Sequence, residues 1–133
     1  MTSQPNVYFA MKTWDEKPYN ELPGELKMTR TSVAYAYQGD IDGESNLDYL
    51  MVYRPDNSGS FVGLERIIGR VAGRAGSFVL QHSGTFDKTA VDSTFFVVPR
   101  SGTGELAGLS GDGVIKLSGH AERYPMIFNF KLD

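Results

Sequence analysis

Glu65 is the first residue of this chain to consider for chemistry, because it is a carboxylate on a strand face that is otherwise apolar. Every second residue from Phe61 to Ile67 shares that face, and the only charged one is Glu65. A carboxylate inside a fold needs a hydrogen-bonding partner, water, or a bound proton. Each of these routes makes Glu65 a candidate catalytic group.

His82 and Tyr49 are the predicted neighbours of Glu65. If Gly73-Arg74 forms a two-residue hairpin loop, the pairing backward from that loop sets Glu65 opposite His82. The same alternation places Tyr49 on the strand at the other side of Glu65. A carboxylate, an imidazole and a phenol in one interior can move a proton or polarise a bound carbonyl. The simpler interpretation is a buried polar network that fixes strand register.

Aromatic and apolar residues on the same faces indicate a lined interior. Such residues can hold an apolar or aromatic ligand, although side chains at this spacing also form an ordinary core. The predicted ligand-binding set is Tyr35, Tyr37, Tyr53, Phe61, Phe78 and Leu80.

The elements that would position these residues are short alternating runs that end in turn residues. One helical turn is expected at Glu105–Leu109, and Asp15–Gly24, with two prolines, reads as an irregular connection. About eight strands follow from this pattern. They are Val7–Trp14, Leu26–Gln38, Glu44–Arg54, Ser60–Val71, Gly76–Phe86, Thr89–Val98, Val114–Leu117 and Tyr124–Leu132.

The predicted fold is all-β, a single closed antiparallel barrel with little helix. The chain has 133 residues, enough for one good core, and no linker or repeat divides it. Fifteen Gly, seven Tyr and eight Phe suit many strands joined by tight turns. Residues 1–133 are therefore taken as one domain.

Three sequence segments carry a resemblance to a known family. They are Ser60-Phe61-Val62-Gly63-Leu64-Glu65-Arg66, the run Gly76–Phe86, and the glycine-rich stretch Gly102–Gly113. Together with Trp14-Asp15-Glu16-Lys17-Pro18-Tyr19 and Gly39–Gly43, they resemble the bacterial DUF3224 family of uncharacterised proteins. The resemblance implies a barrel similar to that of allene oxide cyclases. Those enzymes use a carboxylate and a cysteine, and the cysteine has no counterpart here.

Composition excludes several kinds of partner. A formal net charge of -3 without any Lys/Arg run argues against nucleic acid. No segment is long and apolar enough to predict a membrane span or a signal peptide, and the absence of Cys fits the cytoplasm. With two His, one of them His120 in a predicted turn, no metal site and no cofactor is expected.

Two functional hypotheses remain open at the level of sequence. The first is a barrel that binds a small apolar or aromatic molecule in its interior, with an isomerase or cyclase as the candidate activity. The second is a non-catalytic structural or interaction barrel with a side-chain-filled interior. Outward apolar residues predict a homo-oligomer, a dimer or trimer, in either case. These residues are Val62, Leu64, Val79 and Phe96.

Overall fold

The computed structural model describes residues 4–119 and 121–132, so His120 lies outside the described residues. The described chain is almost entirely β-structure, with one short 3-10 helix, η1 (Gly104–Leu106). The strands are β1 (Val7–Glu21), β2 (Lys27–Gly39), β3 (Ile41–Tyr53), β4 (Gly59–Val71), β5 (Arg74–Phe86), β6 (Ala90–Val97), β7 (Ser110–Ser118) and β8 (Tyr124–Lys131).

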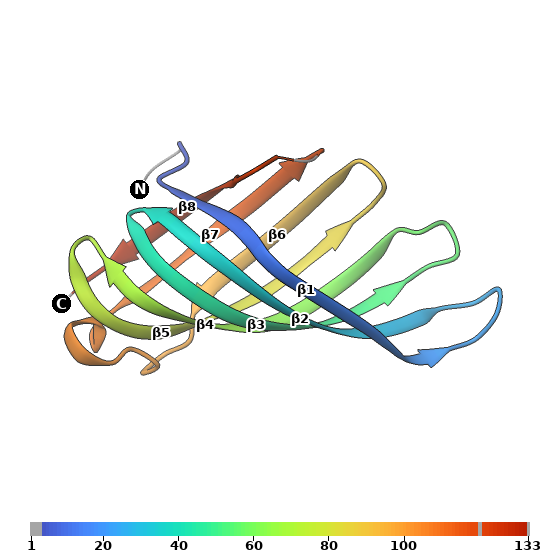
Figure 1. Ribbon diagram of the computed structural model, residues 1–133, viewed down its shortest axis with the longest axis horizontal. Helices are drawn as coiled ribbons and strands as arrows, with labels where there is room; N and C mark the ends of the chain where they lie inside the picture. The colour runs from blue at the N-terminus through green and yellow to red at the C-terminus, as the bar shows by residue number, and fades with distance from the viewer. Residues whose placement is uncertain (1–3, 120, 133) are drawn as a thin grey trace.

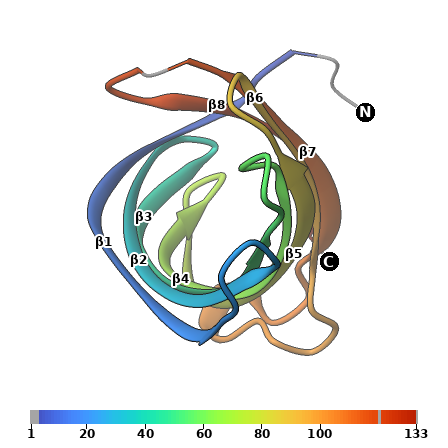
Figure 2. The ribbon, with the colours of Figure 1, turned by 90° about the vertical axis from the view of Figure 1, so that its right-hand side faces the viewer.

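The eight strands form a closed antiparallel barrel in which each strand pairs with its neighbours in sequence and β8 returns to β1. The end-on view in Figure 2 shows this closure. The barrel confirms the fold class predicted from the alternating pattern. Through the middle of β3 and β4, from Ser45 to Met51 and from Phe61 to Ile68, inward residues are buried and outward residues are exposed in strict alternation.

The first strand is much longer than predicted. It runs to Glu21 and takes in most of the segment expected to be an irregular connection. Two bulges, after Met11 and after Pro18, shift its pairing with β2. Pro18 is tolerated because this part of β1 pairs only with β2, and prolines occur at sheet edges and bulges. The prediction of a loop from the proline count was therefore wrong.

The β4–β5 hairpin turns one residue earlier than predicted. Ala72 and Gly73 both have positive φ, 49° and 84°, as the central residues of a type I′ turn do. Val71 therefore pairs with Arg74, and Glu65 pairs with Leu80 rather than with His82. The predicted β4–β5 register is thus wrong by two residues. Because side chains alternate with a period of two, the residues predicted to face inward still do so.

The barrel has one closed end and one open end. Residues 98–109, including η1, pack against β5 at the closed end, where most inward side chains are buried and Phe130 and Leu132 are partly buried. At the other end, inward residues are only partly buried, which defines the barrel mouth. The mouth residues are Tyr53, Phe86, Val91, Leu117 and Tyr124.

Unequal strand lengths produce this mouth. β1 has 15 residues, whereas β6, β7 and β8 have eight or nine. β1 pairs with β8 only from Val7 to Phe9, so the rest of β1 has no partner on that side. The β1–β2 hairpin projects past the short strands at the lower right of Figure 1. Within the described residues, no helix is long and apolar enough to cross a membrane.

Candidate functional site

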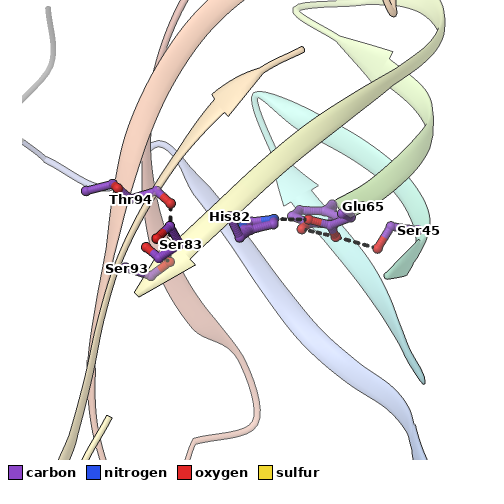
Figure 3. Close-up of polar contacts among 7 residues, drawn as sticks. Ser45, Glu65, His82, Ser83, Ser93 and Thr94 are labelled. Atoms are coloured by element: carbon purple, nitrogen blue, oxygen red, sulfur yellow. Dashed lines mark hydrogen bonds and ion pairs between the residues drawn. The ribbon is translucent and has the colours of Figure 1, made fainter. Parts of the chain in front are cut away.

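Glu65 lies on the inner face of β4 and is fully buried. Its Oε2 accepts hydrogen bonds from the Tyr37 hydroxyl at 2.5 Å and the Ser45 hydroxyl at 2.6 Å. Its Oε1 lies 2.7 Å from Nε2 of His82. Figure 3 shows Ser45 and His82 on opposite sides of the carboxylate. Three donors thus replace the water that the carboxylate loses on burial.

The β-sheet register explains which residues reach Glu65. The residues directly opposite it on the neighbouring strands are Leu47 and Leu80. Ser45 lies two positions before Leu47 on β3, and His82 lies two positions after Leu80 on β5. Residues two positions away across a strand pair point to the same face, and long or polar side chains span the diagonal. The Glu65–His82 dyad therefore forms even though the predicted direct pairing was wrong.

His82 has a ring nitrogen without a partner. Its residue exposure is 2%, and Nδ1 makes no hydrogen bond in the structure. When Glu65 is ionised it can only accept, so Nε2 then carries the proton and donates it to the carboxylate. In the neutral ring, Nδ1 is then a buried lone pair, and leaving it unpaired costs about 1–3 kcal/mol. The rings of Phe95 and Tyr49 lie 5.6 Å and 6.3 Å from the imidazole.

The arrangement has the parts of a general base. One nitrogen of His82 is held by Glu65, which orients the ring and stabilises the imidazolium that forms when the other nitrogen takes a proton. Ser45 and Tyr37 fix the carboxylate in turn. A molecule with an acidic proton near Nδ1 would complete the chain of contacts.

The tyrosines around Glu65 are kept protonated. Burial, followed by the charge of Glu65 and the hydrogen bond to it, holds the pKa of Tyr37 well above its usual value. Burial also raises the pKa of Tyr35 to about 12, against a lowering by its hydrogen bond with Tyr49. The pKa of Tyr49 lies well above normal, again mainly through burial. Tyr49 was expected to donate to Glu65, but it is hydrogen-bonded to Tyr35 instead.

Aromatic rings in the barrel pack closely against glycines of adjacent strands. A Cβ added at Gly63 would stand 2.7 Å from the Tyr49 ring, and one at Gly113 would stand 2.4 Å from the Phe95 ring. The rings of Phe61 and Phe86 cover Gly84 and Gly59 in the same way. These glycines let large rings rest against the barrel wall.

Exposure falls from the mouth toward Glu65. Met51 and Phe61 keep 8% and 7% of their surface, and Tyr35 and Tyr49 keep 9% each. Glu65 has none. The dyad therefore lies behind a layer of slightly accessible aromatic residues.

The predicted ligand-binding residues divide between these two regions. Tyr37 binds Glu65 directly, and Tyr35 and Phe61 lie in the aromatic layer around Tyr49. Phe78 and Leu80 are fully buried. Tyr53 belongs to the mouth and hydrogen-bonds Glu16. Ser45 was missed, although the inward alternation from Met51 back through Leu47 would have placed a hydroxyl inside the barrel.

The surface hollows of the described chain include one along β2–β5 and one along β7 and β8. One, of about 410 Å³, runs outside β2–β5 and is lined by residues such as Asp48 and Arg66. The other, of about 460 Å³, lies along β7, β8 and Asn6. No group of three His, Cys, Asp or Glu that could hold a metal ion occurs among the described residues. Val62, Leu64 and Phe96 are exposed as expected, whereas Val79 is half-buried.

Comparison with known proteins agrees with this fold. A solved structure of a protein of unknown function from the DUF3224 family of Shewanella oneidensis MR-1 is similar, with a TM-score of 0.75 and 27% sequence identity. The match covers 98% of this chain and 99% of that one. No curated protein matches. The model of the family described as "Protein of unknown function (DUF3224)" matches residues 6–130, and the chain therefore belongs to that family.

Proposed function

We propose that the protein binds a small apolar or aromatic molecule inside the barrel and moves a proton on it, as an isomerase or cyclase does. His82 Nδ1 is the base, Glu65 orients it, and the tyrosine layer packs against the molecule. The observation that carries the proposal is the unpartnered Nδ1 in a ring whose other nitrogen is bound to a buried carboxylate.

The proposed reaction is a proton transfer that needs no cofactor. A proton leaves a C–H or O–H of the bound molecule for Nδ1, and the electron pair stays on the molecule and shifts a double bond or closes a ring. The imidazolium, stabilised by Glu65, then returns the proton to another atom of the same molecule. Protonated Tyr35 and Tyr49 can hydrogen-bond an oxygen on which charge develops. Similarity to allene oxide cyclases remains a prediction.

The route to His82 starts at the mouth. Tyr49 contacts His82 on one side and packs against Phe61 on the other, at a ring-centroid distance of 5.0 Å. Phe61 in turn lies 6.3 Å from Phe86, a mouth residue. Entry of a ligand by this route requires Tyr49, which lies between Phe61 and His82, to move aside.

Complete burial of Glu65 favours the second candidate function, a barrel filled by its own side chains. Native mass spectrometry of protein purified from its host lysate distinguishes the ligand-binding barrel from the filled barrel. We expect a small-molecule adduct on the wild type and on Glu21→Gln, an exposed carboxylate of β1, and its loss in Glu65→Gln. Transfer of the wild-type adduct into D₂O should then place deuterium on the bound molecule, and His82→Gln should abolish that exchange.

Absence of any adduct from both wild type and variant would support the filled barrel. Thermal unfolding of each variant shows whether Glu65→Gln is folded. If it is not, His82→Gln serves in its place, because it leaves the carboxylate with its two hydroxyl donors.

We also propose that the protein is a homo-oligomer, a dimer or trimer. Large apolar side chains on the outer faces of β3, β4 and β6 remain about half exposed in the single chain, and a second copy would cover them. They are Leu50, Val62, Leu64, Ile68 and Phe96. Light scattering after size exclusion should give a molar mass that is a multiple of 14.7 kDa, and Leu64→Glu should lower the molar mass to that of the monomer.

A further inference from the structure

A second carboxylate, Glu16, is held at the barrel mouth by its own set of donors. Its Oε2 accepts from the Tyr53 hydroxyl at 2.5 Å and the Thr29 hydroxyl at 2.7 Å. Its Oε1 accepts from the indole N–H of Trp14 at 3.3 Å. All the donors are neutral, and a carboxylate that only accepts has the hydrogen-bond pattern of its ionised form.

This cluster, Glu16 with Trp14, Thr29 and Tyr53, is accessible from solvent. Glu16 is half-buried and Trp14 keeps 43% of its surface. Both residues follow the point where β1 loses its pairing with β8, so no strand covers this side of β1. The Trp14 ring lies 6.4 Å from Tyr49, and the Tyr53 ring lies 5.2 Å from Phe86. The carboxylate therefore contacts the polar edges of two aromatic residues, the indole N–H of Trp14 and the hydroxyl of Tyr53, which themselves pack against further rings.

Glu16 has no ion-pair partner among the described residues. The nearby Lys17 pairs with Asp15 at 3.7 Å. The Lys27 ammonium lies instead over the ring of Tyr53, 4.8 Å from its centroid. That contact shows that this aromatic face accepts a cation.

We propose that the Glu16 cluster is a separate binding site, one that takes an organic ammonium group joined to an apolar or aromatic body. The ammonium pairs with Glu16 and displaces Lys27 from the Tyr53 ring, and the body packs against Trp14. A carboxylate bordered by aromatic rings binds such cations through charge and cation–π attraction together. The site does not depend on proton transfer at His82, since it is defined by binding at the mouth.

Trp14 provides a direct readout because it is the only tryptophan of the chain. Titration of the full chain with benzyltrimethylammonium chloride should change Trp14 fluorescence saturably. Benzyl alcohol and matched NaCl should not. Glu16→Gln should raise the Kd at least about fivefold. Glu21→Gln, which removes an exposed charge further along the same strand, should leave the Kd unchanged.

A second variant tests the role of the competing cation. Lys27→Gln keeps Glu16 and Trp14 and frees the face of Tyr53, so benzyltrimethylammonium should bind about two- to threefold more tightly. Saturation-transfer NMR on the ligand gives the same comparison without relying on fluorescence. Equal binding by wild type and Glu16→Gln, or equal binding of the neutral alcohol, would overturn the proposal.

Discussion

Glu65 and Glu16 present nearly the same hydrogen-bond pattern in two different surroundings. In each cluster one carboxylate oxygen accepts from a tyrosine hydroxyl and a Ser or Thr hydroxyl, and the other faces a ring nitrogen. In both, the hydroxyls come from the inner faces of β2 and β3. Glu65 is fully buried, whereas Glu16 lies at the mouth beside an indole that is 43% exposed. The difference shows that the same set of donors can serve a sealed interior group and an accessible one.

The first consequence of this comparison concerns stability. Removing Glu65 leaves His82, Tyr37 and Ser45 without their acceptor in a region closed to water, while groups around Glu16 can be solvated. We expect Glu65→Ala to lower the free energy of unfolding by about 3–5 kcal/mol, because several buried polar groups lose their partner together. Glu16→Ala should cost about 0.5–1.5 kcal/mol. Urea unfolding of both variants measures the difference.

Equal losses for the two variants would mean that the mouth is as closed to water as the interior. A loss near zero for Glu65→Ala would mean that Glu65 is not paired as described. Glu65→Gln is the milder companion variant, since an amide keeps one acceptor oxygen for the two hydroxyls.

Alkaline pH should weaken the interior cluster. The pKa of Tyr35 is raised from 10.0 to about 12, mainly by burial. A raised pKa favours the protonated state in the fold, so its stabilisation is complete below pH 10 and is lost as the pH rises toward 12. The loss for this one residue is about 2–3 kcal/mol. Tyr37 and Tyr49 act in the same direction, because their pKa values are raised as well.

Urea unfolding between pH 9 and pH 12 should therefore show a steep loss of stability in the range set by the Tyr35 pKa. Tyr35→Phe should make the curve shallower, since it removes one of the titrating phenols. A stability that stays flat across this range would contradict the burial of these tyrosines.

Matched tyrosine variants test the two clusters one hydrogen bond at a time. Tyr37→Phe removes the interior donor to Glu65, and Tyr53→Phe removes the mouth donor to Glu16. We expect a loss of about 1–2 kcal/mol for the first, because its acceptor stays buried, and about 0.5 kcal/mol for the second. Thermal unfolding at neutral pH is the measurement. The reverse order would show that the mouth cluster carries more of the stability.

The barrel could be predicted from the sequence because alternation and turn residues act locally. The inward placement of Tyr49, Met51 and Glu65 followed from parity alone, which an even register error does not change. The β1 extension could not be predicted in this way. Pro18 is compatible with a strand only because β8 is too short to pair with that part of β1, which is a property of the whole barrel.

The sequence predicted part of the candidate site but not all of its hydrogen-bond partners. Glu65 and His82 were placed on one face by parity. The hydroxyl donors to Glu65 depend on diagonal contacts across β2, β3 and β4, which need the true register. The turn at Ala72-Gly73 sets the β4–β5 register, and with it the place of His82, through a positive φ at an alanine, a conformation that alanine rarely adopts. The Glu16 cluster was missed because its strand was taken for a loop.

The smallest expected effect concerns Trp14 itself. Glu16→Ala removes the acceptor of the indole N–H, so the indole is held less firmly at the mouth, and acrylamide should quench its fluorescence more strongly. Glu65→Gln should leave this quenching unchanged, because the interior carboxylate makes no hydrogen bond with Trp14. A parallel increase in both variants would mean that the two clusters are coupled through the Trp14–Tyr49 contact, and the interior would then respond to whatever binds at the mouth.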